Sequence, residues 1–260
     1  MDRVFTWPPG EELDVPESYV GVTIEKLPDG TWHTGVLYRT PQSGTNVLHL
    51  MGHYGGTKRR RFLHENPRPE QLCVLCLVDK VEIPALRRVF LAIYSKNNNP
   101  GLPYGFSPPL GEWFAADGRL VPHPELPGRG LCCQTFVLAA YEAAGLRLID
   151  PPEAPARPDD QERQRGIFDR ISERLNETPA RTQEHFAIVK SNLGIALHRP
   201  LEVAGAAKAD ALPCSFAEAQ ANGKELELLV PNLDDAGSGS VEVVPEVAAI
   251  SHAEPQVGED

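Results

Sequence analysis

The residues with the clearest capacity for chemistry form a short segment in the middle of the chain. Pro127-Gly128-Arg129-Gly130 leads directly into an apolar run over residues 131–144 that is typical of a helix, and Gly145 ends it. Cys132 and Cys133 therefore lie at a helix N-terminus. Unpaired backbone N–H groups and the positive end of the helix dipole favour thiolate over thiol there, and the same N–H groups can hold an oxyanion. The segment predicts a nucleophilic cysteine.

A nucleophilic cysteine needs a base, and an earlier strand-like segment offers one. In residues 46–53, His49 and His53 are four apart, so an extended chain places both on one face, with Leu48 and Leu50 on the other. We expect whichever face meets the cysteine-bearing helix to hold an imidazole beside the thiol. That is the Cys–His arrangement of acyl-transfer enzymes, with His49 as general base.

The cysteine segment also resembles a known family. Cys133-Gln134-Thr135-Phe136-Val137 after its glycine-rich approach is similar to the nucleophile helix of NlpC-type papain-like hydrolases. It looks still more like the Asn-Cys-Glu-His-Phe-Val pattern of the lecithin retinol acyltransferase relatives. Those relatives are circularly permuted, and their histidine strand precedes the cysteine helix, which is the order of His49 and Cys133. The resemblance covers roughly residues 15–150. It implies that Cys133, and not Cys132, is the nucleophile.

The residue that would orient the imidazole stays open. The candidates are His53 on the same strand face, His64 in the following loop, and Asp79 at the end of the next strand. Cys132 stands where the family pattern has a different residue. We interpret it as a neighbour without a catalytic role, or as a second thiol that protects the first from overoxidation.

These residues predict a cysteine peptidase or amidase that cleaves a peptide or isopeptide bond through an acyl-enzyme. It would need no cofactor and no metal ion, and its partner would be a peptide or protein substrate. The acyltransferase resemblance implies an alternative, acyl transfer or thioester hydrolysis with a lipid donor. A third possibility is a non-catalytic binding module that contacts a protein partner through its C-terminal region.

The first third of the chain is rich in predicted strands. Residues 19–25 and 31–39 flank a Pro-Asp-Gly turn and predict a hairpin, and residues 46–53 and 72–78 predict two further strands of a mostly antiparallel sheet. Residues 84–97 carry the apolar spacing of a helix that packs on this sheet. Cys73 and Cys76 are three apart in a strand, so they point to opposite faces and are interpreted as core residues rather than metal ligands.

We therefore expect an α+β fold, papain-like and circularly permuted, over residues 1–150. Proline-rich residues 151–158 introduce a helical extension that runs to residue 231 and packs on the first domain. Its helices are predicted at residues 159–175, 180–192, 200–209 and 215–221. Residues 232–260 contain seven acidic side chains and no Lys or Arg, so they predict a disordered tail that could contact a protein partner.

Composition narrows the function classes further. The chain has 260 residues with 25 Lys and Arg against 36 Asp and Glu, a formal net charge of −11, which disfavours sequence-independent nucleic-acid binding. No segment approaches the roughly 18 apolar residues of a membrane span. Five cysteines without an export signal predict reduced thiols and a cytoplasmic protein. The dense basic run at residues 58–61 is interpreted as a solvated loop.

Overall fold

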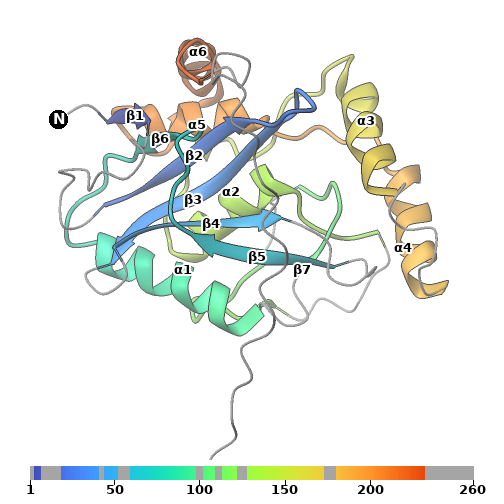
Figure 1. The fold of residues 1–260 in the computed structure, drawn as a ribbon, viewed down its shortest axis with the longest axis horizontal. Helices are drawn as coiled ribbons and strands as arrows, with labels where there is room; N and C mark the ends of the chain where they lie inside the picture. Colours follow the sequence, from blue (N-terminus) through green and yellow to red (C-terminus); the bar gives the residue numbers. More distant parts are fainter. Residues whose placement is uncertain are drawn as a thin grey trace, which may run out of the picture.

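A twisted antiparallel sheet forms the centre of the molecule, and helices cover one of its faces (Figure 1). The computed structural model describes residues 3–6, 19–40, 44–51, 59–97, 102–108, 113–121, 128–172 and 180–231. The strand order is β1-β6-β2-β3-β4-β5-β7. The strands are β1 (Val4–Thr6), β2 (Val20–Lys26), β3 (Trp32–Thr40), β4 (Gly44–Met51), β5 (Arg59–Glu65), β6 (Leu72–Leu75) and β7 (Leu102–Pro103). This mixture of helices and an antiparallel sheet confirms the α+β class.

The predicted β2–β3 hairpin is confirmed. Gly30 has φ +78° and donates its N–H to the carbonyl of Leu27 at 2.8 Å, which closes the turn. Val22 pairs with Val36 in β3, and Val36 pairs in turn with Leu48 in β4. Directly paired residues share one face, so this row crosses three strands on the same side of the sheet.

β5 was not predicted, and the expected loop at residues 58–61 is corrected in its described part. Residues 59–61 and His64 belong to β5, which pairs with β4 through Met51 and Arg61. A run of basic residues lacks the alternation that marks a strand. The unpaired edge of β4 supplies the hydrogen bonds that extend it into the sheet.

The strand predicted at residues 72–78 is present but shorter, as β6 (Leu72–Leu75), and the interpretation of Cys73 and Cys76 as core residues is confirmed. It pairs with β2, on the opposite side from β3. Cys73 lies in a small cluster on one face, while Cys76 packs on the other face, 3.6 Å from the Tyr141 hydroxyl. Burial raises the pKa of each thiol to about 12, so both are neutral core residues.

The two faces of the sheet differ in content. One face carries Val36, Tyr38, Leu48 and Leu50 into the main apolar core, where they meet the helices. The other face carries a smaller apolar cluster, and this cluster contains Tyr19, Leu37, Val47, Cys73 and Leu75.

Two predicted helices cover the main core, and both are confirmed. α1 (Ile83–Asn97) contacts β2 and β3, and α2 (Cys133–Ala143) contacts β3 and β4. α2 starts at Cys133 instead of residue 131, because Leu131 donates its N–H to the carbonyl of Pro103 and so pairs with a neighbouring segment. Gly145 ends the helix with φ +84°.

The C-terminal region contains the four predicted helices, but they divide between two cores. The helices are α3 (Asp160–Ser172), α4 (Ala180–Ser191), α5 (Pro200–Lys208) and α6 (Phe216–Glu227); two short strands, β8 (Ile149–Asp150) and β9 (Cys214–Ser215), pair in parallel. α5 and α6 enter the main core, and α5 contacts β2, β3 and β6. α3 and α4 lie to one side (Figure 1), where they form a second core with Tyr104, Phe106 and Cys132. Residues 151–231 therefore contribute to the main core through α5 and α6, and they form a second core through α3 and α4.

No helix in the described ranges is long and apolar enough to cross a membrane. The predicted acidic tail, residues 232–260, lies outside the described residues, and so does His53.

Candidate active site

Cys133 is the first residue of α2 and is partly exposed. Its Sγ lies 3.2 Å from Oε1 of Gln134, to which the thiol donates. Cys132 differs, because it is the N-cap residue of α2 and its side chain is buried in the second core. The backbone N–H of Cys132 donates to Thr135 Oγ1 at 3.0 Å, and burial raises the pKa of its thiol. Of the two thiols, Cys133 is the one that an electrophile can approach.

The segment that leads into Cys133 is held closely by its neighbours. Gly130 donates its N–H to Ser107 Oγ and accepts the N–H of Ser107, both at 3.1 Å. A Cβ at Gly130 would lie 2.3 Å from the carbonyl carbon of Tyr104, so no larger residue fits. These contacts hold the backbone immediately before α2 in place, and an oxyanion site requires backbone donors that are held in place.

His49 does not lie on the face that meets α2. A Cβ built on Gly35 would meet the Cβ of His49 and Cγ1 of Val47, each at 2.9 Å, so His49 shares the face of Val47. The face against α2 carries Leu48 and Leu50 instead. The expectation that the face meeting the cysteine helix would hold the imidazole is corrected here. A leucine side chain gains more than an imidazole from burial against an apolar helix.

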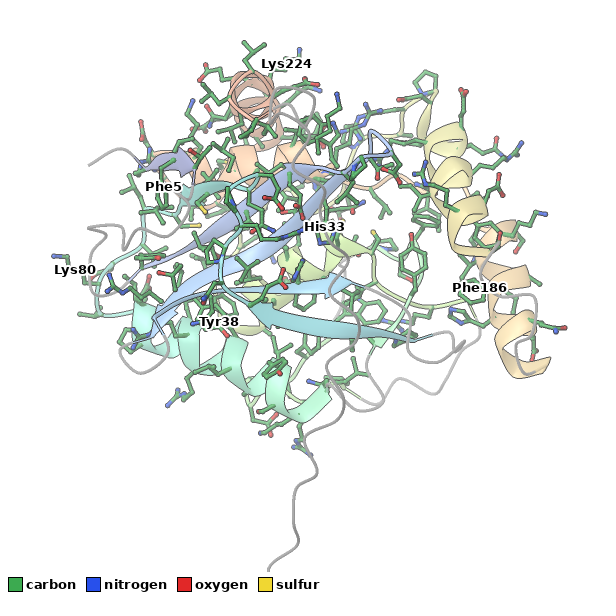
Figure 2. All side chains as sticks on the ribbon, in the orientation of Figure 1. Phe5, His33, Tyr38, Lys80, Phe186 and Lys224 are labelled. Atoms are coloured by element: carbon green, nitrogen blue, oxygen red, sulfur yellow. The ribbon has the colours of Figure 1, made fainter. Side chains whose placement is uncertain are left out.

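His49 takes part in a chain of side chains that crosses three strands, in which both imidazoles are buried and Glu65 is partly exposed. Its Nδ1 lies 3.0 Å from Nε2 of His33 on β3, and its Nε2 lies 3.1 Å from Oε1 of Glu65 on β5. The second contact is close but poorly aligned for a linear N–H···O bond. Hydrogen bonding from His49 nevertheless lowers the pKa of Glu65, while the His49 ring itself is fully buried. Figure 2 labels His33 on the sheet.

A second acidic residue lies beside this chain. Glu25 pairs with His33 in the β2–β3 register and receives Arg68 Nη2 at 2.8 and 2.9 Å and Gln71 Nε2 at 3.3 Å. Its pKa is raised by burial, and the Arg68 guanidinium opposes that shift. Arg68 thus offsets part of the cost of a buried carboxylate next to two imidazoles.

Three of these residues could hold a metal ion. Glu25, His33 and His49 each offer a ligand atom, and the three atoms lie within 4.8 Å of one another. The existing contacts favour a different use. Arg68 and Gln71 already hold the Glu25 carboxylate, and the two imidazoles face each other at hydrogen-bond distance.

Sequence reasoning missed His33. His33 is two residues from Gly35 on the same face of β3, and Gly35 lies close to His49. The pairing of β3 with β4 sets this neighbourhood, and the sequence alone does not give that register. The structure places His64 and Asp79, the other candidates for the residue that orients the imidazole, outside this chain. Position 64 pairs with Leu48 in the register, and Asp79 accepts the N–H of Val81 at 3.1 Å in an exposed turn.

The histidine chain and Cys133 lie toward the same end of the sheet. β3 and β5 both run antiparallel to β4, so they begin at one end, and β7 pairs with the start of β5. Leu131 donates its N–H to Pro103 of β7 at 3.0 Å, which places Cys133 two residues beyond this contact. His33 is the second residue of β3, at that same end.

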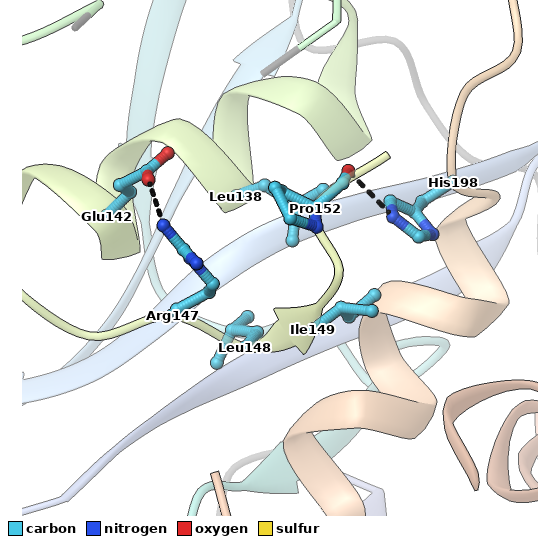
Figure 3. Close-up of a pocket in the computed structure, with 7 residues that line it drawn as sticks. All are labelled: Leu138, Glu142, Arg147, Leu148, Ile149, Pro152 and His198. Atoms are coloured by element: carbon cyan, nitrogen blue, oxygen red, sulfur yellow. Dashed lines mark hydrogen bonds and ion pairs between the residues drawn. The ribbon is translucent and has the colours of Figure 1, made fainter. Parts of the chain in front are cut away.

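A small apolar pocket lies elsewhere on α2 (Figure 3). Its lining residues are Leu138, Glu142, Arg147, Leu148, Ile149, Pro152 and His198. Arg147 contacts Glu142 at 3.3 Å, and His198 Nε2 contacts the Pro152 carbonyl at 3.0 Å. Nδ1 of His198 has no hydrogen-bond partner among the described residues and lies 3.9 Å from Oε2 of Glu202. Nothing in this lining is a nucleophile.

Comparisons with known proteins find no matching family model, no matching curated protein and no matching solved structure.

Proposed function

We propose that the protein is a cysteine hydrolase with a circularly permuted papain-like fold, in which Cys133 is the nucleophile and His33 is the base. One observation carries the proposal: a Glu65–His49–His33 chain, with both imidazoles buried, reaches the end of the sheet where Cys133 opens α2. His49 then orients the base instead of acting as the base. The antiparallel sheet that precedes the cysteine helix supports the permuted order.

The chain favours one tautomer of His33. The Glu65 carboxylate can only accept a proton, which favours N–H on Nε2 of His49 and a lone pair on its Nδ1. The proton between the two rings then belongs to Nε2 of His33. The lone pair of His33 therefore resides on Nδ1, and a ring held in this form can take up a thiol proton.

The two residues would have to meet around the end of the sheet, because α2 packs on the Leu48 face and the histidine chain lies on the other. Cys133 is suited to this as the first residue of its helix, beyond the part that packs in the main core. Its partial exposure also leaves room for a substrate carbonyl.

The chemistry follows from these roles. His33 takes the thiol proton, and Cys133 Sγ forms a bond to the substrate carbonyl carbon while backbone N–H groups hold the oxyanion. The carbonyl–nitrogen bond breaks, and the imidazolium gives its proton to the leaving amine. Water then attacks the thioester, His33 takes a proton from that water, and the carbonyl–sulfur bond breaks. The acid product leaves, and the proton returns to the thiolate.

The proposed substrate class is an amide, as a peptide or an isopeptide. A lipid ester or thioester would react by the same steps with an alcohol or thiol as leaving group. A peptide amide and an acyl thioester offered to the same preparation separate these cases, and hydrolysis of the thioester alone would favour the lipid alternative.

The test is alkylation of Cys133 by iodoacetamide across a pH series. We expect an apparent pKa for labelling well below about 8.5, the free-thiol value, and a shift back toward that value in His33→Ala. Cys132→Ser and His198→Gln are matched controls that should label like the wild type. Labelling of Cys133 no faster than a solvent thiol, or no response to His33→Ala and His49→Ala, would overturn the proposal and favour a binding module.

A further inference from the structure

His185 on α4 joins the helical extension to the segment that leads into Cys133. Gly128 donates its N–H to Nδ1 of His185 at 3.0 Å, and Nε2 of His185 lies 2.7 Å from the carbonyl oxygen of Tyr104. The imidazole is buried, with 1% of its surface exposed. One ring therefore links two backbone segments that are far apart in the sequence.

The two contacts determine the protonation state of this ring. A backbone N–H can only donate, so Nδ1 of His185 must carry the lone pair. A backbone carbonyl can only accept, so Nε2 must carry the hydrogen. The geometry thus requires the neutral Nε2–H tautomer, because a proton on Nδ1 would face the N–H of Gly128.

His185 joins the segment that leads into Cys133, which we call the cysteine approach, to the neighbouring segment that pairs with it. Gly128 begins the described approach, and Tyr104 pairs with Leu131 just before Cys132. Gly128 has φ +84°, and a Cβ there would lie 2.3 Å from Cγ2 of Ile188, one turn further along α4. α4 therefore contacts the approach twice, through a hydrogen bond and through a close apolar contact.

We propose that His185 is a positioning residue, which fixes the backbone before Cys133 from the helical extension and does so only while its ring is neutral. This rests on the proposed function for its catalytic meaning, since it adds the structural support of that nucleophile. The helical extension would then support the active site, and the backbone before Cys133 should become less ordered as His185 takes up a proton.

Two ionisable groups belong to the apolar cluster beside this ring. In the described part of the second core, they are Tyr104 and Cys132, and Arg163 acts on the Cys132 thiol. A phenol ordinarily titrates near pH 10, and burial raises the pKa of the Cys132 thiol. Below neutral pH both stay uncharged, so neither Tyr104 nor Cys132 accounts for a change in this region between about pH 7 and 5.

The test uses His185→Gln and His185→Leu, with His198→Gln as a matched buried control. A glutamine carries both an acceptor and a donor, so it can replace the two bonds, whereas leucine replaces neither. By hydrogen exchange, we expect the amides of residues 128–131 to exchange roughly tenfold faster in His185→Leu, as for one lost hydrogen bond, and near the wild-type rate in His185→Gln. Cys133 labelling at neutral pH should follow the same order, and the loss of exchange protection at acid pH should be absent in His185→Gln.

Equal exchange in the wild type and both His185 variants would overturn the proposal. If His185→Leu does not fold, nitrogen-15 NMR of the wild-type imidazole decides, because the proposal requires hydrogen on Nε2 and none on Nδ1 at neutral pH. A proton on Nδ1 would contradict it. Hydrogen exchange does not depend on catalysis, so it tests the role of His185 separately from the proposed function. If Cys133 labels like a solvent thiol, only the proposed function is overturned.

Discussion

The two faces of the central sheet use the same strands for different purposes. One face is apolar and packs against α1, α2 and α5, with Leu48 as a central member. The other holds the chain of His33, His49 and Glu65 beside a smaller apolar cluster. Adjacent residues on β4, Leu48 and His49, thus belong to different environments. A strand can stabilise the fold with one face while the other holds polar groups in fixed positions.

The difference also shows where a buried polar group is tolerated. Each ring nitrogen of His49 lies close to another side chain, so its complete burial does not leave both without partners. The apolar face meets helices whose side chains offer few such partners. A histidine placed at Leu48 would be buried without the partners that β3 and β5 provide to His49.

Truncating one leucine on each face should give the largest effect. Both Leu48 and Leu37 are fully buried, but Leu48 lies in the main core and Leu37 in the smaller cluster. We expect Leu48→Ala to lower the free energy of unfolding by about 2–5 kcal/mol, and Leu37→Ala by less, because the smaller cluster can relax into the space. Urea unfolding measures both. Equal losses would contradict the distinction between the faces.

Adding one methyl group to the polar face should give an intermediate effect. Gly35→Ala would press on the Cβ of His49 and on Val47, and we expect a loss of about 1–3 kcal/mol of unfolding free energy from overpacking. The same change should slow Cys133 labelling by displacing His49. Gly166→Ala in α3 is the control, since no atom lies within 4 Å, and helix propensity predicts a gain of about 0.5–1 kcal/mol. An unchanged free energy of unfolding in Gly35→Ala would contradict close packing around His49.

The smallest expected effect is a pH dependence on the polar face. The pKa of Glu65 is lowered from 4.5, chiefly by hydrogen bonding from His49. Its contribution to stability is therefore present above pH 4.5 and is lost as the pH falls through the lower folded value. Glu65→Gln should flatten the decline in stability over that acid window by less than about 1 kcal/mol, because Glu65 is partly exposed. Unfolding curves from pH 6 to 3 test this, and an unchanged slope would contradict the coupling.

Much of the fold could be predicted from local pattern. The Pro-Asp-Gly turn, the apolar spacing of residues 84–97 and Gly145 after residues 131–144 act over a few residues, and the elements they predict are present. β5 could not be predicted, because its pairing depends on the edge of β4 and not on alternation of its own. The placement of α5 in the main core was not predicted for a similar reason, since the proline-rich residues before it indicated an extension that packs on the first domain.

By itself, the sequence determined which residue types could react and which share a strand face: Cys133 opens a helix, and Leu48 and His49 point in opposite directions. Only the tertiary structure decided which face the helices would cover, and that choice joined His49 to His33 and Glu65. Alternation along a strand is local geometry, set by the backbone of a few residues. The covering of a face depends on the total apolar area that distant helices can bury, which no single segment contains.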